Sequence, residues 1–223
     1  MKPLLVLAAF PMVLMGWASC SHSGTGHAAL PDPRAVDKSV PEYKNPFHPS
    51  TYAHFVARKD YRKTYDVYKD DTLLNRQPKK SRKIFVCLDE QRGQYLVDGL
   101  VAMDFPLSSG VKAYPTKTGD YAVISKKEDH TSNLYGKMYD AEGKCINYNA
   151  ESTDPVPEGG RFDGSPMPYW QRLTNAGLGL HVGKVRRHPV SHGCVRLPRN
   201  VAEILYRQTS IGTPVTIRKT PLP

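Results

Sequence analysis

The sequence predicts a mainly β protein, a β-sandwich with one short helix late in the chain. Three observations support this fold class. Short apolar runs recur from residue 82 onward, and turns rich in Gly, Asp or Ser separate them. Residues 101–107 alternate between apolar and other side chains, as in a strand. Helical periodicity is convincing only after residue 199. Short strands with frequent turns favour a sandwich or barrel over alternating strands and helices.

The first predicted strands follow one another closely. Strands are expected over 84–88 and 94–97, with a turn at 90–93 between them. Asp98-Gly99 is a strong signal for a two-residue hairpin turn. The apolar residues of 101–107 then predict a strand with one buried face, formed by Val101, Met103, Phe105 and Leu107.

The middle of the chain is more polar. A turn at 118–120 leads into a strand over 121–125. Residues 126–168 are rich in Gly, Asp, Asn and Pro, and they predict a long loop. A loop of this length inside a compact domain is usually functional or poorly ordered, and here it is compatible with a flap over a site.

The last elements are a strand, a helix and a strand. Residues 178–182 predict a strand. The helix is expected to begin with Asn200 as its cap and Glu203 as the partner in a capping box, and to stop at Gly212. A strand over 215–217 closes the chain.

The first twenty residues predict the compartment. A positive start precedes an almost wholly apolar run over 4–17, so residues 1–20 are predicted to be a secretory signal peptide. The ending Ala18-Ser19-Cys20 resembles the lipobox of bacterial lipoproteins, although Trp17 stands where an aliphatic residue is usual. Lipidation of Cys20 is favoured, which would anchor the protein to a membrane in the cell envelope. Plain signal cleavage and an uncleaved anchor are the alternatives.

Two segments separate the signal from the β-rich region. Residues 21–50 are rich in Pro, Ser, Gly and charge, which predicts a linker. Residues 51–80 form a tyrosine-rich N-terminal extension, with a short helix near 52–56 or a strand at 65–68. Its Tyr, Lys and Arg residues are compatible with binding a sugar polymer or nucleic acid, but packing of the tyrosines against the following domain is favoured.

The formal net charge of +10 predicts attraction to anionic partners. No zinc-finger spacing, RNA-binding sheet signature or basic heptad helix is present in the sequence, so nucleic acid is not expected to be the partner.

Three cysteines remain after Cys20: Cys87, Cys145 and Cys194. The number is odd, so at least one free thiol is expected in an oxidising compartment. Cys87 lies in an apolar run and is predicted to be a buried hydrophobic residue. A disulfide between Cys87 and Cys145 stays open, because sequence does not give their distance.

Residues 179–198 carry the richest chemistry in the chain. They combine a cysteine and a serine with three histidines. An imidazole can take the thiol proton, and the resulting thiolate is a nucleophile. His192 shares a face with Cys194 if the segment is extended, so it rivals His181 as the base. Metal binding by the cluster is a further possibility, but its ligands do not follow a standard zinc spacing.

Ser191-His192-Gly193-Cys194-Val195-Arg196 resembles the active-site signature of the L,D-transpeptidase family of bacterial cell-wall enzymes. The stretches 84–88, 106–110 and 115–121 resemble further motifs of that family, and the resemblance covers about 81–219. It implies an L,D-transpeptidase-type sandwich in this catalytic domain. Nine residues separate His181 from Ser191, which resembles a subgroup with a short loop.

The resemblance implies roles for several residues. Cys194 would be the nucleophile and His181 the base, oriented by a backbone carbonyl, while His192 shapes the pocket. The Gly193 and Cys194 N–H groups are candidate oxyanion donors. Ser191 is either a hydrogen-bonding site residue or a turn residue. Candidate substrate-binding residues are Arg196, which would grip a carboxylate, and the aromatic pair Tyr169 and Trp170, which line the cleft or pack in the core.

The implied reaction is acyl transfer on peptidoglycan stem peptides through a cysteine thioester, and it forms cross-links in the cell wall. No cofactor or metal is implied. Resolution of the thioester by water would make the same site an L,D-carboxypeptidase. An alternative of a different class is a non-catalytic lipoprotein that binds peptidoglycan through its basic surface.

Overall fold

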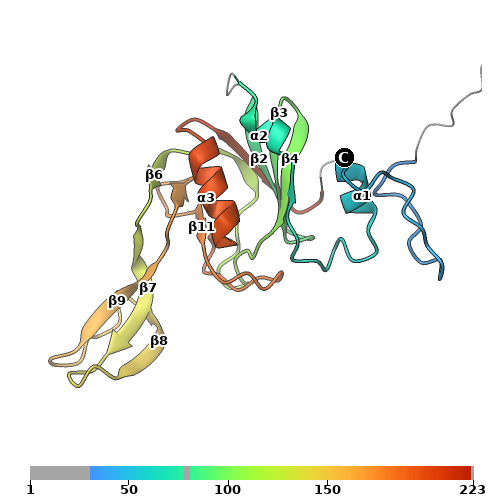
Figure 1. Ribbon diagram of the computed structural model, residues 1–223. Coiled ribbons are helices and arrows are strands. Elements are labelled where there is room, and N and C mark those ends of the chain that lie inside the picture. Colours follow the sequence, from blue (N-terminus) through green and yellow to red (C-terminus); the bar gives the residue numbers. More distant parts are fainter. Residues whose placement is uncertain (1–30, 78–80, 222–223) are drawn as a thin grey trace, which may run out of the picture. The chain divides into compact units, whose positions relative to one another are not determined.

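The computed structural model describes residues 31–77 and 81–221, and from Asp32 onward the chain forms one compact unit (Figure 1). The predicted signal peptide 1–20, with Cys20, lies outside the described residues, so lipidation stays a prediction. Within the described part of the chain, no helix has the length and apolar character needed to cross a membrane.

Three sheets and one longer helix make up this unit, which confirms the mainly β class. The six-stranded sheet has the order β1-β4-β3-β2-β13-β5, the four-stranded sheet β12-β11-β10-β6, and the three-stranded sheet β8-β7-β9. The strands are β1 (Tyr68–Lys69), β2 (Arg82–Cys87), β3 (Arg92–Val97), β4 (Leu100–Pro106), β5 (Gly119–Ala122), β6 (Ser125–Lys127), β7 (Thr131–Tyr139), β8 (Cys145–Glu151), β9 (Arg161–Pro166), β10 (Trp170–Arg172), β11 (Gly179–Val182), β12 (Val195–Leu197) and β13 (Pro214–Arg218). The helices are α1 (Tyr52–Ala57), α2 (Asp71–Asn75) and α3 (Arg199–Gln208).

The large sheet is built on the meander β2-β3-β4. The predicted hairpin turn is confirmed, because Asp98 and Gly99 connect β3 to β4 with φ values of 51° and 79°. Strand β13 pairs in parallel with β2 and antiparallel with β5. Strand β13 therefore lies within the sheet rather than at its edge.

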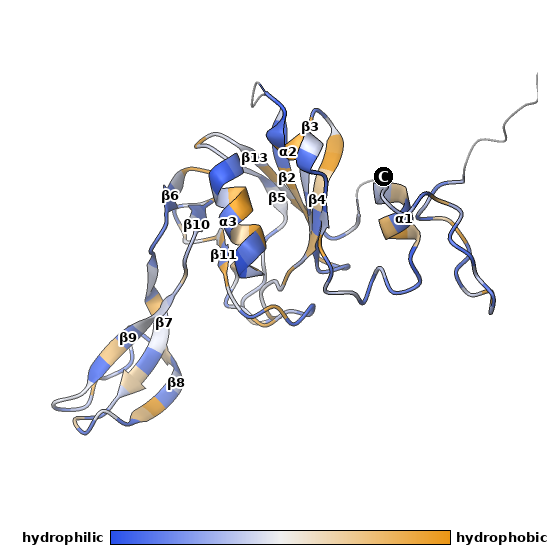
Figure 2. Ribbon diagram, viewed as in Figure 1, coloured by the Kyte–Doolittle hydropathy of each residue, from blue (hydrophilic) through white to orange (hydrophobic). Residues whose placement is uncertain are grey.

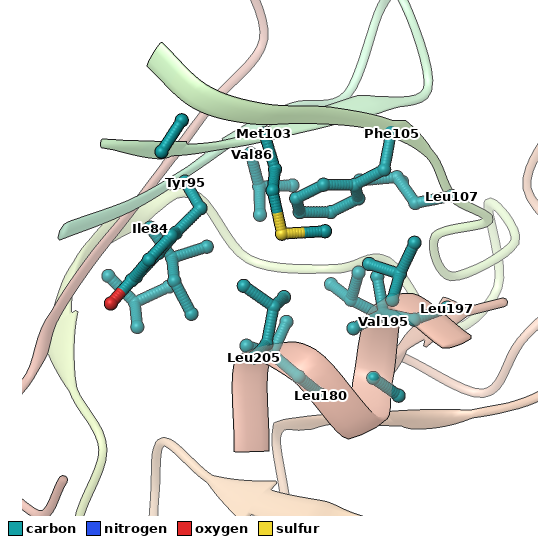
Figure 3. Close-up of a cluster of buried hydrophobic side chains, with 14 of the residues drawn as sticks. Ile84, Val86, Tyr95, Met103, Phe105, Leu107, Leu180, Val195, Leu197 and Leu205 are labelled. Carbon is teal, nitrogen blue, oxygen red and sulfur yellow. The ribbon is translucent and has the colours of Figure 1, made fainter. Parts of the chain in front are cut away.

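The main core lies between this sheet and the elements that carry the later part of the chain. Apolar side chains of β2, β3 and β4 meet those of β11, β12 and α3 (Figure 3). The labelled members are Ile84, Val86, Tyr95, Met103, Phe105, Leu107, Leu180, Val195, Leu197 and Leu205, all buried. Strands β11 and β12 are thus held in place by their core-facing side chains, and the segment between them carries the candidate site.

The predicted helix after the cysteine is confirmed, but its predicted caps are wrong. Pro198 occupies the N-cap position without a side-chain hydrogen bond, and Asn200 and Glu203 lie inside α3. Proline has no N–H, so one of the four donors that lack a partner at a helix start is absent, but its side chain cannot accept from the others. Glu203 instead pairs with Arg207, and the helix ends at Gln208, with Thr209 as its C-cap, rather than at Gly212. Figure 2 shows hydrophilic and hydrophobic sides on this helix.

The prediction that β4 has one buried face is wrong. Ala102 and Asp104, which point to the opposite face from Met103 and Phe105, are also fully buried. The reason is that the tyrosine-rich extension covers the outer face of the large sheet. The extension was predicted to pack its tyrosines against the domain, and Tyr52 and Tyr61 do so.

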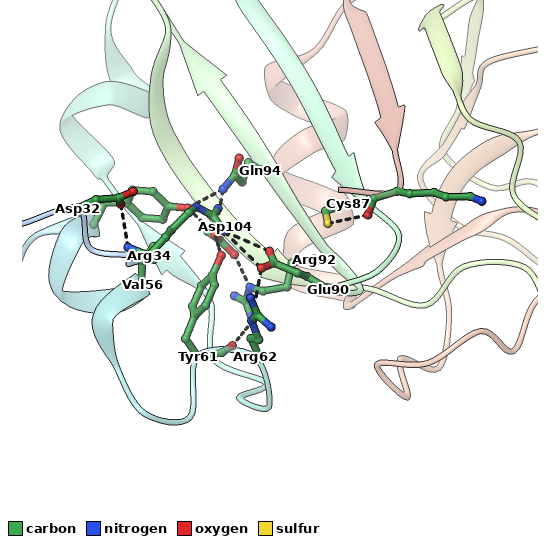
Figure 4. Close-up of polar contacts among 12 residues, drawn as sticks. Asp32, Arg34, Val56, Tyr61, Arg62, Cys87, Glu90, Arg92, Gln94 and Asp104 are labelled. Carbon is green, nitrogen blue, oxygen red and sulfur yellow. Dashed lines mark hydrogen bonds and ion pairs between the residues drawn. The ribbon is translucent and has the colours of Figure 1, made fainter. Parts of the chain in front are cut away.

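Asp104 is the centre of the contact between extension and sheet (Figure 4). Its carboxylate accepts hydrogen bonds from the Tyr52 and Tyr61 hydroxyls at 2.7 and 2.8 Å. It also pairs with Arg92 at 2.5 Å, and both side chains are 1% exposed or less. The Arg92 guanidinium donates further to backbone carbonyls of the extension, including that of Thr64 at 3.2 Å, and lies over the Tyr61 ring. This burial and the nearby carboxylate raise the pKa of both tyrosines.

Residues 32–50, within the segment expected to be a linker, contact the extension. Lys38 Nζ donates to the Val56 carbonyl at 2.6 Å, and the Tyr43 hydroxyl donates to the Ala57 carbonyl at 2.8 Å. The Pro and Gly content of this segment predicted a linker without fixed contacts. Instead, the side chains of Lys38 and Tyr43 both bind the backbone of α1.

The segment 126–168, predicted to be a loop, instead forms β7, β8 and β9 and part of β6. We call the sheet of β7–β9 the flap. Its glycines suggested a loop, but two of them allow strands to pair closely. A Cβ on Gly136 would lie 2.1 Å from the Asp163 carbonyl oxygen, and one on Gly164 would lie 2.0 Å from that of Ser132. Close backbone approach is a use of glycine that composition alone does not separate from a turn.

The three described cysteines are all free, so the possible bridge between Cys87 and Cys145 is not formed. Cys87 is buried, as predicted, and its thiol donates to the Lys219 carbonyl at 3.2 Å (Figure 4).

Candidate active site

The candidate site is built on the parallel pair β11 and β12. Leu180 lies opposite Val195 and His181 opposite Arg196, and Cys194 directly precedes β12. Because Leu180 and Val195 are buried in the core, His181 and Arg196 face the other way. The register of two packed strands therefore places the histidine and the cysteine in one region.

A cleft of about 820 Å³ opens above these strands. It is lined by most of the predicted site residues, namely Trp170, His181, Ser191, His192, Gly193, Cys194 and Arg196. The flap forms another wall through residues 132–136 and 148–150. The expectation that 126–168 lies over the site thus holds for its position, although it is a sheet and not a loop.

The Cys194 thiol is partly buried. It donates to the Gly177 carbonyl at 3.3 Å. Burial raises its pKa above the ordinary value of a thiol, while the Gly179 N–H and Arg196 act in the opposite direction. The resting group near neutral pH is therefore the thiol, and nucleophilic attack requires a base to remove its proton.

His181 has the properties of such a base. Its Nδ1 lies 2.7 Å from the Val182 carbonyl oxygen. A carbonyl only accepts, so Nδ1 carries the hydrogen and Nε2 has the free lone pair. Burial lowers the His181 pKa to about 4, and Arg196 and His130 add to the effect. The ring is neutral near pH 7, and its orientation by a backbone carbonyl agrees with the expectation.

His192, the rival base, is held by aromatic rings. It stacks on Tyr135 of the flap, with ring centroids 4.4 Å apart and planes 18° apart, and it contacts Tyr114 at 4.9 Å. Burial lowers its pKa, and Arg196 lowers it further. The His192 ring therefore connects the flap to the loop between β11 and β12, residues 183–194, which we call the cysteine loop. This contact is in keeping with a pocket-shaping role.

Ser191 stabilises the conformation of the loop that carries Cys194 through two hydrogen bonds. Its hydroxyl donates to the Cys194 carbonyl and accepts from the Gly193 N–H at 3.2 Å. Gly193 has a φ of 113°, which disfavours a side chain. The Gly193 N–H, a predicted oxyanion donor, is thus used within the loop in this state.

The two aromatic candidates differ in position. Trp170 is 3% exposed and lines the cleft, and its ring centroid lies 5.9 Å from that of His181. Tyr169 does not line the cleft and instead packs against Tyr206 of α3 at 5.6 Å. Arg196 is half-buried in the cleft wall, where burial lowers its pKa and Cys194 opposes that effect.

Sequence reasoning missed several lining residues. His130 lies 5.0 Å from Trp170, and Tyr135 reaches His192 from β7. Both belong to the segment predicted to be a loop, where no strand register was available to orient them. Arg172 also lines the cleft and went unnoticed, although it lies only two residues beyond Trp170.

Gly110 is expected to be essential for the position of the cysteine loop. A Cβ there would lie 2.1 Å from the Tyr114 carbonyl oxygen and 2.8 Å from Gly193 Cα. Gly110→Ala should therefore displace Gly193 and lower the acylation rate by about 100-fold, the effect of a misplacement near 1 Å. Acylation is followed by mass spectrometry and folding by circular dichroism. Gly143→Ala is the control for a strained glycine substitution away from the cleft, because Gly143 has a φ of 79° but no atom within 4 Å of an added Cβ; equal rates for both variants would contradict the expectation.

His181 is expected to make stability depend on pH. Its pKa falls from 6.5 in the unfolded chain to about 4 in the fold, so between these values the unfolded state binds more protons. The contribution is full above pH 6.5 and is lost as pH falls through 4, and it amounts to about 3 kcal/mol. Urea unfolding at pH 7 and pH 4.5 should show a smaller pH effect for His181→Gln than for wild type. His188→Gln, on an exposed histidine, should keep the wild-type dependence.

The alternative that the His and Cys cluster of 179–198 binds a metal is not supported by the arrangement of the described residues. Across residues 31–77 and 81–221, no three His, Cys, Asp or Glu side chains are placed to hold a metal ion together.

Comparison with known proteins assigns the family. The model of the YkuD family, described as the L,D-transpeptidase catalytic domain, matches residues 81–217. A curated relative, "Probable L,D-transpeptidase 3" of Mycobacterium tuberculosis, is 31% identical over 121 residues, which are 51% of this chain and 38% of the relative. This chain thus spans about two fifths of that relative's length.

Two solved structures are also similar. An L,D-transpeptidase from Mycobacterium smegmatis has 22% identity and a TM-score of 0.47, covering 61% of this chain and 58% of that chain. One from Stackebrandtia nassauensis has 22% identity and a TM-score of 0.46, covering 74% and 65%. With a family model that matches more than half of its length, this chain belongs to the L,D-transpeptidase catalytic domain family.

Proposed function

We propose that this protein is a cysteine L,D-transpeptidase that joins stem peptides of peptidoglycan. The observation that carries the proposal is the placement of Cys194 and a neutral, carbonyl-oriented His181 in one cleft, on paired strands. A family of this kind acts on the cell wall, outside the cytoplasm.

The first half of the reaction forms a thioester. His181 Nε2 takes the Cys194 proton, and the sulfur attacks the carbonyl between an L-centred diamino acid and a terminal D-amino acid. The new S–C bond gives a tetrahedral oxyanion. Its collapse breaks the C–N bond, and the leaving amine takes the proton from His181. The stem remains attached to Cys194 as an acyl group.

The second half transfers the acyl group. An amine of a second stem attacks the thioester carbonyl and gives its proton to His181. The S–C bond breaks, an amide forms, and the thiolate recovers the proton. The Cys194 backbone N–H is the proposed oxyanion donor, and the Gly193 N–H would join it only after leaving Ser191. Arg196 would hold a substrate carboxylate.

The same proposal covers the organisation of the chain. Residues 1–20 act as a signal peptide, Cys20 carries a lipid anchor to the membrane, and 81–219 form the catalytic domain. Residues 51–80 act as an N-terminal extension that supports this domain, in keeping with the buried contacts at Asp104.

The test is incubation of muropeptides having tetrapeptide stems with the wild-type protein and with Cys194→Ala, followed by mass spectrometry. A cross-linked dimer and a released D-amino acid are expected with wild type alone. Tripeptide stems without dimers would assign an L,D-carboxypeptidase instead. Unchanged muropeptides with correctly folded wild type would refute both activities and leave a binding protein.

A further inference from the structure

The cleft around Cys194 has an unusual charge balance. Four cationic side chains line it, those of Lys117, Arg172, Lys184 and Arg196, and none of its lining residues is Asp or Glu. Within residues 31–77 and 81–221, none of these four cations forms an ion pair. The nearby carboxylate of Glu151 lies outside the lining and accepts a hydrogen bond from Tyr114.

The cations are spread along the strand beside the thiol. Arg172, at the end of β10, pairs with Gly179 at the start of β11, and Lys184 follows two residues after the end of that strand. The five steps along the chain from Gly179 to Lys184 correspond to at most about 16 Å of extended chain, the length of a short peptide. Cys194 lies at the Gly179 end of this span, since its thiol meets Gly177 and Gly179. Arg196 packs along Gly183 near the other end.

Unpaired cations in a partly enclosed cleft concentrate positive potential there, because low-dielectric walls focus the field. A neutral amide would gain nothing from that potential, whereas each carboxylate would gain a charge-assisted hydrogen bond. A peptide with one carboxylate near its reacting bond and others farther along its length matches the arrangement.

We propose that Arg172 and Lys184 are specificity-determining residues that select stem peptides with free carboxylates over stems in which those groups are amidated. The inference rests on the proposed function and names the chemical form of its substrate. Arg196 would meet the carboxylate nearest the reacting bond, while Arg172 and Lys184, at the two ends of the span 179–184, would bind other carboxylates of the stem.

The experiment compares two synthetic tetrapeptide stems that differ only in side carboxylates or carboxamides. With the full chain, kcat/KM for release of the terminal D-amino acid should favour the carboxylate stem by about 10-fold or more at low salt, and the ratio should shrink at 0.5 M NaCl. Arg172→Gln and Lys184→Gln should each lower the ratio several-fold. Arg207→Gln, the same charge change on the exposed side of α3, should preserve it.

A second measurement separates the inference from the proposed activity. Binding of both stems to Cys194→Ala is measured by calorimetry, and the carboxylate stem should bind more tightly. Equal turnover, or equal binding, of the two stems overturns the inference and leaves the activity standing. Tighter binding of the carboxylate stem without turnover by wild type overturns the activity and keeps the selectivity. Equal effects of Arg172→Gln and Arg207→Gln would assign the selectivity to overall charge and overturn the role of Arg172.

Discussion

Cys194→Ala should abolish covalent acylation of the protein while leaving its fold intact. The sulfur is the atom that forms the thioester, so its removal should lower turnover by about 10⁴-fold or more, as the loss of a nucleophile does in other acyl-transfer enzymes. Incubation with a carbapenem, followed by mass spectrometry of the intact protein, should show one adduct on wild type and none on the variant. An adduct on Cys194→Ala would place the nucleophile elsewhere.

The two histidines should respond differently in the same assay. His181→Gln removes the neutral base beside a thiol whose pKa is raised by burial, so acylation should be slow at pH 7 and should recover as pH rises. His192→Gln leaves that base in place and removes the ring that stacks on Tyr135, so its defect should not recover with pH. A reversed pattern would make His192 the base.

Asp104→Ala should cause the largest loss of stability among single substitutions outside the cleft. It leaves the Arg92 guanidinium buried without its carboxylate, and it removes the acceptor of two tyrosine hydroxyls. Breaking one side of a buried pair costs about 3–5 kcal/mol. For a protein of this size the melting temperature should fall by about 10 °C. Thermal unfolding followed by circular dichroism measures the effect.

Two comparisons sharpen this expectation. Glu203→Ala breaks the exposed pair with Arg207 and should change stability by less than about 0.5 kcal/mol. The double variant Arg92→Met with Asp104→Leu removes both buried charges and should recover much of the lost stability. If Asp104→Ala melted at the wild-type temperature, the pair would not stabilise the contact between extension and sheet.

Much of the scaffold was predictable because its signals are local. The Asp98-Gly99 turn and the last strand are encoded within a few neighbouring residues, and the structure has both. The segment with His181 and Cys194 was also recognisable from its own residues. Its geometry follows from the register of β11 on β12, which places two short apolar strands side by side in the core.

The rest depends on contacts between distant segments. Nothing near Asp104 in the sequence indicates that Tyr52 and Tyr61 will bury it. The flap was missed because its glycines were interpreted as turn signals, whereas Gly136 is required for close pairing of strands. The charge of the cleft was missed for a related reason, since Arg172 and Lys184 line one cleft only when β10 and β11 pair.

The position of β13 has a consequence for the order of folding. This strand supplies an interior position of the large sheet, yet it is made from residues 214–218, far along the chain from its parallel partner β2. Val215 must find Ile84 across more than a hundred intervening residues, a closure that is slow because chain entropy opposes it. Because β13 joins β2 to β5, the large sheet stays incomplete until this long-range pairing forms. The pairing of β13 is therefore expected late in folding, after the local meander β2-β3-β4.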